Sequence, residues 1–151
     1  MSEALRIAGY ASLFHRRDGA GDRVEPGAFR TTLRQRPASR VAMLWQHDPA
    51  MPIGRWTRLT ETAHGLWAEG ELASGVLKAR EAACLIAAGA SNGLSIGFKA
   101  RKAHRDPRSV KRNLKQIDLW EISLVTFPQV EEARVRLLPA IRNGRGSGSH
   151  I

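Results

Sequence analysis

The segment that most constrains the fold is "LKQIDLWEISLVTF", residues 114–127, which has the composition of a long β-strand. Strand alternation puts Glu121 on one face together with Leu119 and Val125. The opposite face carries three further apolar residues, Trp120, Ile122 and Leu124. Because both faces are apolar, this strand is expected in the centre of a sheet.

Several other segments also have the pattern of strands. They are residues 5–14, 40–46, 53–62, 65–72, 94–101 and 133–138. Segments 53–62 and 65–72 alternate apolar and polar residues around a turn, which predicts a hairpin with one solvent-exposed face. The stretch between 101 and 112 is polar and basic, and is expected to be a hairpin tip.

Two segments have helical patterns. Residues 24–35 contain Pro26 early, where proline fits the first turn of a helix. Residues 74–89 carry apolar residues at helical spacing, with Ser74 as the expected N-cap and Gly89 beyond the end. The predicted fold is therefore mainly β (α+β): a small antiparallel or mixed β-barrel with two or three helices packed outside.

Length and composition indicate an ordinary globular protein. The 151 residues, 42% hydrophobic and 25% charged, predict one domain over residues 1–140 and a flexible Gly/Ser-rich tail over 141–151. No apolar run approaches the roughly 18 to 20 residues that span a bilayer, and no secretory pattern opens the chain. We therefore expect the protein to stay in the compartment where it is made. The net charge of +10 favours contact with polyanions.

The single cysteine, Cys84, excludes an internal disulfide. It lies in an apolar helical context, which favours a small buried side chain over a catalytic thiol. The sequence contains no H-E-x-x-H pattern, no carboxylate set at ligand spacing and no glycine-rich phosphate loop. We therefore expect neither a metal nor a cofactor.

The stretch "NGLSIGF", residues 92–98, contains the pattern G-x-S-x-G. Alternation puts Ser95 on one face with Gly93 and Gly97, so its hydroxyl is expected to be open to an approaching backbone. This is what a nucleophile facing an extended peptide needs. Taken alone, an ordinary strand serine beside a tight packing contact is the simpler interpretation.

A serine nucleophile needs a base, and the chain has five histidines. Four lie in polar turns, in the basic tip or in the tail: His15, His64, His104 and His150. His47 differs because it follows the apolar series of strand 40–46 and is expected at the strand's end. A turn histidine beside Asp48 and Pro49 remains an alternative.

The central strand carries a carboxylate, Glu121, in apolar surroundings. An unpaired carboxylate there would be destabilising by several kcal/mol, so a partner must hydrogen-bond it. An arginine or a backbone amide could serve, and so could the N–H of an imidazole, as in a catalytic triad. The order His47, Ser95, Glu121 and the absence of a helix after Ser95 exclude the nucleophile elbow of α/β-hydrolases.

The chain resembles the prohead maturation proteases of tailed phages, whose fold and catalytic serine and histidine are similar to those of herpesvirus assemblins. The matching landmarks are "GYASLF", "VEPGAF", "LWQHDPAMPIGRW", "GLWAEGEL", "GLSIGF" and "IDLWEISLVTFPQVEEARV". The resemblance implies that Ser95 is the nucleophile, His47 the base and Glu121 the third member of a triad. It also points to oxyanion donors near Gln129 to Glu132. Gly93, Gly97, Gln129 and Val130 are therefore candidates for oxyanion or substrate binding.

The resemblance implies a serine endopeptidase that cleaves the scaffolding segment of a major capsid protein, or a separate scaffold, inside the assembling procapsid in the host cytoplasm. It also implies that the protein cleaves itself and is compatible with a homodimer. Two other functions stay open: a nucleic-acid-binding module that uses the basic hairpin of residues 99–115, and a catalytically silent scaffold protein of the procapsid.

Overall fold

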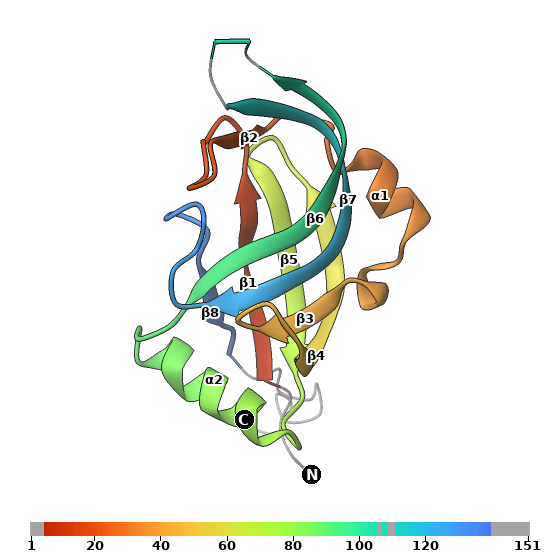
Figure 1. Cartoon of the computed structure of the whole chain (residues 1–151). Helices are drawn as coiled ribbons and strands as arrows, with labels where there is room; N and C mark the ends of the chain where they lie inside the picture. Colours follow the sequence, from red (N-terminus) through yellow and green to blue (C-terminus); the bar gives the residue numbers. More distant parts are fainter. Residues whose placement is uncertain (1–4, 106, 109–110, 140–151) are drawn as a thin grey trace, which may run out of the picture.

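The computed structural model describes residues 5–105, 107–108 and 111–139. It contains eight strands, two α-helices and one short 3-10 helix (Figure 1). The strands are β1 (Leu5–Leu13), β2 (Asp22–Val24), β3 (Ala42–Trp45), β4 (Asp48–Glu61), β5 (Gly65–Leu72), β6 (Gly93–Arg105), β7 (Arg112–Val125) and β8 (Val135–Leu137). The helices are α1 (Arg30–Gln35), η1 (Ala38–Arg40) and α2 (Leu77–Ala87). The predicted tail, residues 141–151, lies outside the described residues.

Strand β7 lies inside one mixed sheet, with paired strands along both of its edges. The sheet order is β2-β7-β3-β4-β5-β1-β8, and β6 pairs with β7. Strands β2 and β3 run parallel to β7, whereas β6 runs antiparallel to it. The prediction of a central strand over residues 114–127 is confirmed.

The sheet curls until the start of β6, which pairs with β7, meets the segment that precedes β8 at the opposite edge (Figure 1). Strand β1 pairs with β5 on one side and with β8 on the other. Gly93, at the start of β6, forms an isolated bridge with Arg134, just before β8. Two hydrogen bonds of 2.8 Å flank this bridge, from Leu94 N to Ala133 O and from Val135 N to Asn92 O. The predicted mainly-β fold, a small antiparallel or mixed barrel with two or three helices packed outside, is confirmed, and the barrel is observed as one mixed, curled sheet with two α-helices.

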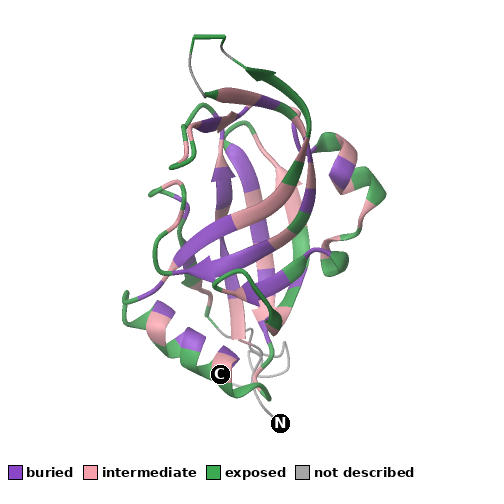
Figure 2. Ribbon diagram, in the orientation of Figure 1, coloured by how far each residue is buried: buried purple, intermediate pink, exposed green. Residues whose placement is uncertain are grey.

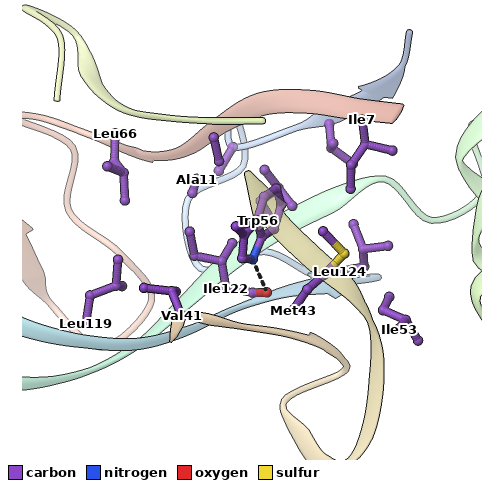
Figure 3. Close-up of a cluster of buried hydrophobic side chains, with 14 of the residues drawn as sticks. Ile7, Ala11, Val41, Met43, Ile53, Trp56, Leu66, Leu119, Ile122 and Leu124 are labelled. Atoms are coloured by element: carbon purple, nitrogen blue, oxygen red, sulfur yellow. Dashed lines mark hydrogen bonds between the residues drawn. The ribbon is translucent and has the colours of Figure 1, made fainter. Parts of the chain in front are cut away.

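The hydrophobic core lies inside the curl of the sheet (Figure 2). Its largest side chain is Trp56 on β4, which is 0% exposed. The indole Nε1 donates a hydrogen bond to the carbonyl oxygen of Ile122 at 3.3 Å, so its polar atom is satisfied (Figure 3). Figure 3 shows apolar side chains from β1, β3, β4, β5 and β7 around this indole.

Helix α1 begins later than the sequence predicts. Gly27 has a φ of +92°, and two turn hydrogen bonds precede the helix, from Ala28 N to Glu25 O and from Arg30 N to Gly27 O. Glu61 on β4 accepts hydrogen bonds from the backbone amides of Gly27 and Phe29. These contacts hold residues 25–29 in a turn, so the prediction that Pro26 lies in the first helical turn is wrong.

Helix α2 is shorter than the predicted segment 74–89. It begins at Leu77 with Val76 at the N-cap position, so the prediction of a Ser74 cap is wrong. Gly89, with a φ of +71°, follows the end of the helix as predicted. The helix packs against β4, β5 and β8 at one end of the sheet (Figure 1).

The buried face of α2 is narrower than the apolar spacing suggests. It consists of Ala79, Ala82, Ala83 and Ile86. Leu77 is 64% exposed and Cys84 is also exposed, which corrects the expectation of a buried cysteine. Three alanines and Ile86 make the contact with the sheet, so Leu77 is free to point outward.

The β6–β7 hairpin is longer than predicted, because its strands continue through much of the segment expected as a polar tip. Three register shifts interrupt the pairing of the two strands. The outer part carries exposed basic side chains, among them Lys99, Lys102, Arg105 and Lys115.

Within the described residues, no helix has the length and apolar character that crossing a membrane requires.

Candidate active site

His47 lies in a two-residue turn between β3 and β4. Trp45 pairs with Asp48 across the turn, and the intervening residues Gln46 and His47 have φ values of +52° and +61°. Such left-handed pairs close tight hairpins but normally use glycine or asparagine. The sequence prediction put His47 at the end of a strand, and the structure places it in the adjoining turn.

The carboxylate of Glu121 on β7 is the partner of His47. The distance from His47 Nδ1 to Glu121 Oε2 is 2.5 Å, and the two side chains are 42% and 13% exposed. The hydrogen bond raises the pKa of the His47 imidazole above its ordinary value. Partial burial opposes this shift, and the negative charge of Glu121 adds to it. The sequence left an arginine, a backbone amide or an imidazole as possible partners of Glu121, and the structure shows the imidazole of His47.

Ser95 lies on β6 directly opposite Ser123 of β7. Paired residues of antiparallel strands project to the same face, so Ser95 shares a face with Glu121, two residues from Ser123. The Ser95 side chain is buried, and among the described residues its hydroxyl makes no hydrogen bond, including to His47. The three predicted residues thus come from β6, β7 and the β3–β4 turn and lie on one side of the sheet.

Gly93 and Gly97, the neighbours of Ser95 on its face, do not leave open clearance. A Cβ at Gly97 would clash with the carboxylate of Glu121, the residue opposite it. A Cβ at Gly93 would lie 2.7 Å from Pro128 Cδ. The expectation of space for an approaching peptide backbone is therefore wrong at both positions. The protein's own Glu121 and Pro128 occupy that space.

A pocket opens beside Ser95. Strands β1, β2 and β6 and the segment before β8 line it, mostly with apolar side chains, and Arg16 and Asp18 contribute charge. Gln129 and Val130, predicted as oxyanion or substrate-binding candidates, line this same pocket. The backbone N–H groups of these two residues make no hydrogen bond within the described part of the chain. The structure thus brings Gln129 and Val130 near Ser95.

The sequence prediction missed Ser123, which connects His47 and Glu121. Its side chain is 0% exposed, and its Oγ accepts a hydrogen bond from His47 N at 3.0 Å. The same hydroxyl donates to Glu121 Oε1 at 2.7 Å. Strand alternation places Ser123 on the face of Glu121, which was the available signal. The contact with His47, 76 positions away, had no signal in the sequence.

The other described histidines make no hydrogen bond to His47, Ser95 or Glu121, although His15 lines a second cavity together with Gln129 and Val130. His15, His64 and His104 are exposed, the first two in turns and the third on β6. His150 is outside the described residues. No group of three or more His, Cys, Asp or Glu side chains suited to a metal ion occurs in residues 5–105, 107–108 and 111–139.

Two phage proteins are similar to this chain in sequence. One is a prohead protease of Enterobacteria phage HK97, 34% identical over 135 residues, which cover 88% of this chain and 60% of that protein. The other is a capsid polyprotein of Pseudomonas phage PAJU2, also 34% identical, over 107 residues that cover 67% of this chain and 16% of the polyprotein. The chain thus spans less than two thirds of either relative.

Herpesvirus proteases share the fold. A Kaposi's sarcoma-associated herpesvirus (KSHV) protease in complex with a hexapeptide phosphonate inhibitor has a TM-score of 0.62 and 13% identity over 91% of this chain and 66% of that chain. The varicella-zoster virus protease has a TM-score of 0.57 and 17% identity over 88% of this chain and 63% of that chain. At these identities the likeness concerns the fold alone.

The family described as Caudovirus prohead serine protease matches residues 1–144. This match covers nearly the whole chain, including His47, Ser95 and Glu121. It agrees with the resemblance that the sequence motifs indicate. The chain therefore belongs to the Caudovirus prohead serine protease family.

Proposed function

We propose that this protein is a serine endopeptidase with Ser95 as nucleophile, His47 as general base and Glu121 as the residue that orients His47. The observation that carries the proposal is the 2.5 Å contact between His47 Nδ1 and Glu121 Oε2, on the face of the sheet that also bears Ser95. Family membership supports the same chemistry.

In the proposed reaction, Glu121 accepts a hydrogen bond from Nδ1–H of His47, which leaves Nε2 free to act as the base. His47 Nε2 takes the proton of Ser95 Oγ while this oxygen attacks the scissile carbonyl carbon. The tetrahedral intermediate collapses as His47 returns the proton to the leaving amine. Water then releases the acyl group by the same steps. Since Ser95 and His47 share no hydrogen bond in the free protein, substrate binding is expected to bring them together.

The oxyanion of the intermediate needs hydrogen-bond donors beside Ser95. The backbone N–H groups of Gln129 and Val130 are our candidates, because both residues line the pocket beside Ser95. Neither group has a hydrogen-bond partner among the described residues. A donor without a partner in the free protein is available to an incoming substrate.

We further propose that the substrate is the scaffolding segment of a major capsid protein or a separate scaffold, and that the protein also cleaves itself. The family description and the two phage relatives support this assignment. The place of action would be the assembling procapsid in the host cytoplasm. A homodimer is also proposed, since a KSHV protease was solved with a dimer disruptor.

The proposal is tested by co-expression with the capsid precursor encoded beside the protein, followed by mass spectrometry of the released peptides. We expect Ser95→Ala to retain the fold, judged by circular dichroism, and to lower cleavage by at least about a thousandfold. Ser91→Ala is the matched control, because Ser91 is also buried but bonds to Thr126. Undiminished cleavage by Ser95→Ala would overturn the proposal.

The same cleavage experiment tests one alternative, and a nucleic-acid binding assay tests the other. A silent scaffold protein predicts no cleavage by the wild type under any assembly condition. A nucleic-acid-binding module predicts affinity for DNA or RNA that falls steeply with salt and depends on exposed basic residues such as Lys102 and Arg105. These residues lie on the outer β6–β7 hairpin, so their substitution is expected to leave Ser95 unaffected.

A further inference from the structure

The buried hydroxyl of Ser123 occupies the junction between the backbone of His47 and the carboxylate of Glu121. We propose that Ser123 is a positioning residue that holds these two groups in register for catalysis. The proposal rests on the proposed function, because it assigns a role in the same reaction. Ser123 itself need not touch the substrate.

The donors and acceptors around Ser123 allow only one arrangement of its hydrogen bonds. The backbone N–H of His47 can only donate, so Ser123 Oγ accepts at 3.0 Å. An ionised carboxylate can only accept, so the single proton of Ser123 points to Glu121 Oε1 at 2.7 Å. With Oε1 held, Oε2 is the oxygen left to face His47 Nδ1. Ser123 thereby selects the orientation of the carboxylate.

Ser123 also stabilises the unusual backbone of the β3–β4 turn. Gln46 and His47 both have positive φ values, a conformation that side-chain-bearing residues adopt only when their surroundings enforce it. Besides the His47–Glu121 contact, two backbone amides of the turn donate hydrogen bonds to β7: His47 N to Ser123 Oγ, and Gln46 N to Leu124 O at 2.9 Å. The first depends on the Ser123 side chain, whereas the second is purely backbone.

Strand pairing fixes where the Ser123 side chain can go. Ser123 pairs with Leu44 of β3 on one side and with Ser95 of β6 on the other. It is fully buried, so no water can replace its hydroxyl without rearrangement. An alanine at this position would leave the His47 amide and Glu121 Oε1 each short of one hydrogen bond.

Ser123→Ala is the test, with activity measured on a peptide that spans the cleavage site. We expect kcat to fall roughly 10- to 100-fold, the range for losing a hydrogen bond to a charged group, with KM changed less than threefold. In the Glu121→Gln background the same substitution is expected to lower kcat less than threefold, because the positioned carboxylate is already gone. An equal loss of kcat in both backgrounds would refute a role through Glu121.

A proton NMR spectrum of the free protein supplies a readout that does not need activity. The Nδ1–H proton of His47, bonded to Glu121, is expected far downfield in the wild type and in the Ser91→Ala control, and to shift or disappear in Ser123→Ala. An unchanged resonance would overturn the proposal even if kcat fell. If Ser123→Ala does not fold, Ser123→Cys, with its weaker donor, takes the same two tests.

The two readouts separate this proposal from the proposed function. If the wild type cleaves no substrate but Ser123→Ala still loses the His47 resonance, the endopeptidase assignment fails, and Ser123 is shown to hold His47 against Glu121 without a role in cleavage. If the wild type cleaves and Ser123→Ala matches it in kcat and in resonance, the positioning role fails alone.

Discussion

At the scale of single residues, Gly97 illustrates how the site depends on an absent side chain. It lies opposite Glu121 in the β6–β7 ladder, and a Cβ there would overlap the Glu121 carboxylate. The glycine therefore allows Glu121 to lie over β6, where it contacts His47 and Ser123. A glycine that suggested room for substrate in fact makes room for the proposed third triad member.

The raised pKa of His47 predicts the pH dependence of cleavage. The proposed base must be neutral, so kcat/KM should fall as pH drops through the pKa of His47 in the free enzyme. Because the hydrogen bond that His47 donates to Glu121 raises this pKa, we expect the midpoint above 6.5, the ordinary value. The measurement is kcat/KM for a cleavage-site peptide across pH.

The substitution Glu121→Gln is the matched comparison, since it keeps the shape of the side chain and removes its charge. We expect it to lower the plateau of kcat/KM and to move the midpoint downward, because both raising effects of Glu121 on the His47 pKa are reduced. A wild-type midpoint below 6.5 would contradict the contact seen between His47 and Glu121.

At the scale of elements, β7 organises the molecule. It pairs with β2, β3 and β6, and it supplies Glu121 and Ser123 to the site. The parallel pairing with β3 matters most, because Ala42 lies opposite Glu121 and Leu44 opposite Ser123. This register brings the turn that follows β3 to the two polar side chains of β7.

Asp118 of β7 connects three elements through ion pairs. Arg36, at the end of α1, approaches one of its oxygens at 3.0 Å, and Arg101 of β6 approaches the other at 2.9 Å. The hydrogen bond from Arg101 and the charge of Arg36 lower the pKa of Asp118, although burial opposes the shift. A lowered pKa means that the carboxylate stabilises the fold above its unfolded-state pKa and that this contribution is lost as pH falls through its folded-state pKa.

We therefore expect Asp118→Asn to lower the free energy of unfolding at pH 7 by about 1 kcal/mol, the scale for partly exposed ion pairs. The difference from wild type should shrink as pH falls below 4, measured by urea unfolding. Asp48→Asn is the control, because Asp48 is exposed and accepts a hydrogen bond from Ala50 N that an amide oxygen can also accept. A difference that grows toward low pH would show that the ion pairs do not stabilise the fold.

At the scale of the whole molecule, the curl of the sheet gathers one core around Trp56. This side chain is fully buried and fills the space between strands that are far apart in the sequence (Figure 3). Its indole nitrogen also bonds to the backbone of β7. Removal of Trp56 should therefore affect stability more than removal of a tryptophan on the surface.

We expect Trp56→Ala to lower the free energy of unfolding by about 3 to 5 kcal/mol, the range for large aromatic residues in cores. Trp120→Ala is the matched control. Trp120 is 53% exposed and contacts the Arg36 guanidinium, so its loss should lower stability by about 1 kcal/mol or less. Urea unfolding of both variants checks the contrast, and equal losses would contradict the position of Trp56 at the centre of the core.

Much of the fold could be predicted because strand patterns are local. The alternation in residues 53–72 predicts the β4–β5 hairpin, and the two apolar faces of 114–127 predict a central strand; both are present. Helix boundaries were less accurate, because contacts such as those of Glu61 with the backbone at Gly27 and Phe29 decided where α1 begins. Such contacts join residues more than 30 positions apart.

The candidate site likewise has a part that the sequence predicts and a part that only the structure shows. His47, Ser95 and Glu121 could be named from residue type, order and family resemblance, since side chains of these types can act as nucleophile, base and orienting acid. Ser123, the two positive φ values at Gln46 and His47, and the clash that Gly97 avoids follow from the parallel register of β3 on β7 and the antiparallel register of β6 on β7. By itself, therefore, the sequence determined seven of the eight described strands, all except β2 (Asp22–Val24), together with the central position of residues 114–127 and the candidate chemistry, because alternation and side-chain type are local properties. Only the tertiary structure decided which polar groups meet, because hydrogen bonds between β7 and the β3–β4 turn depend on a register that no local pattern encodes.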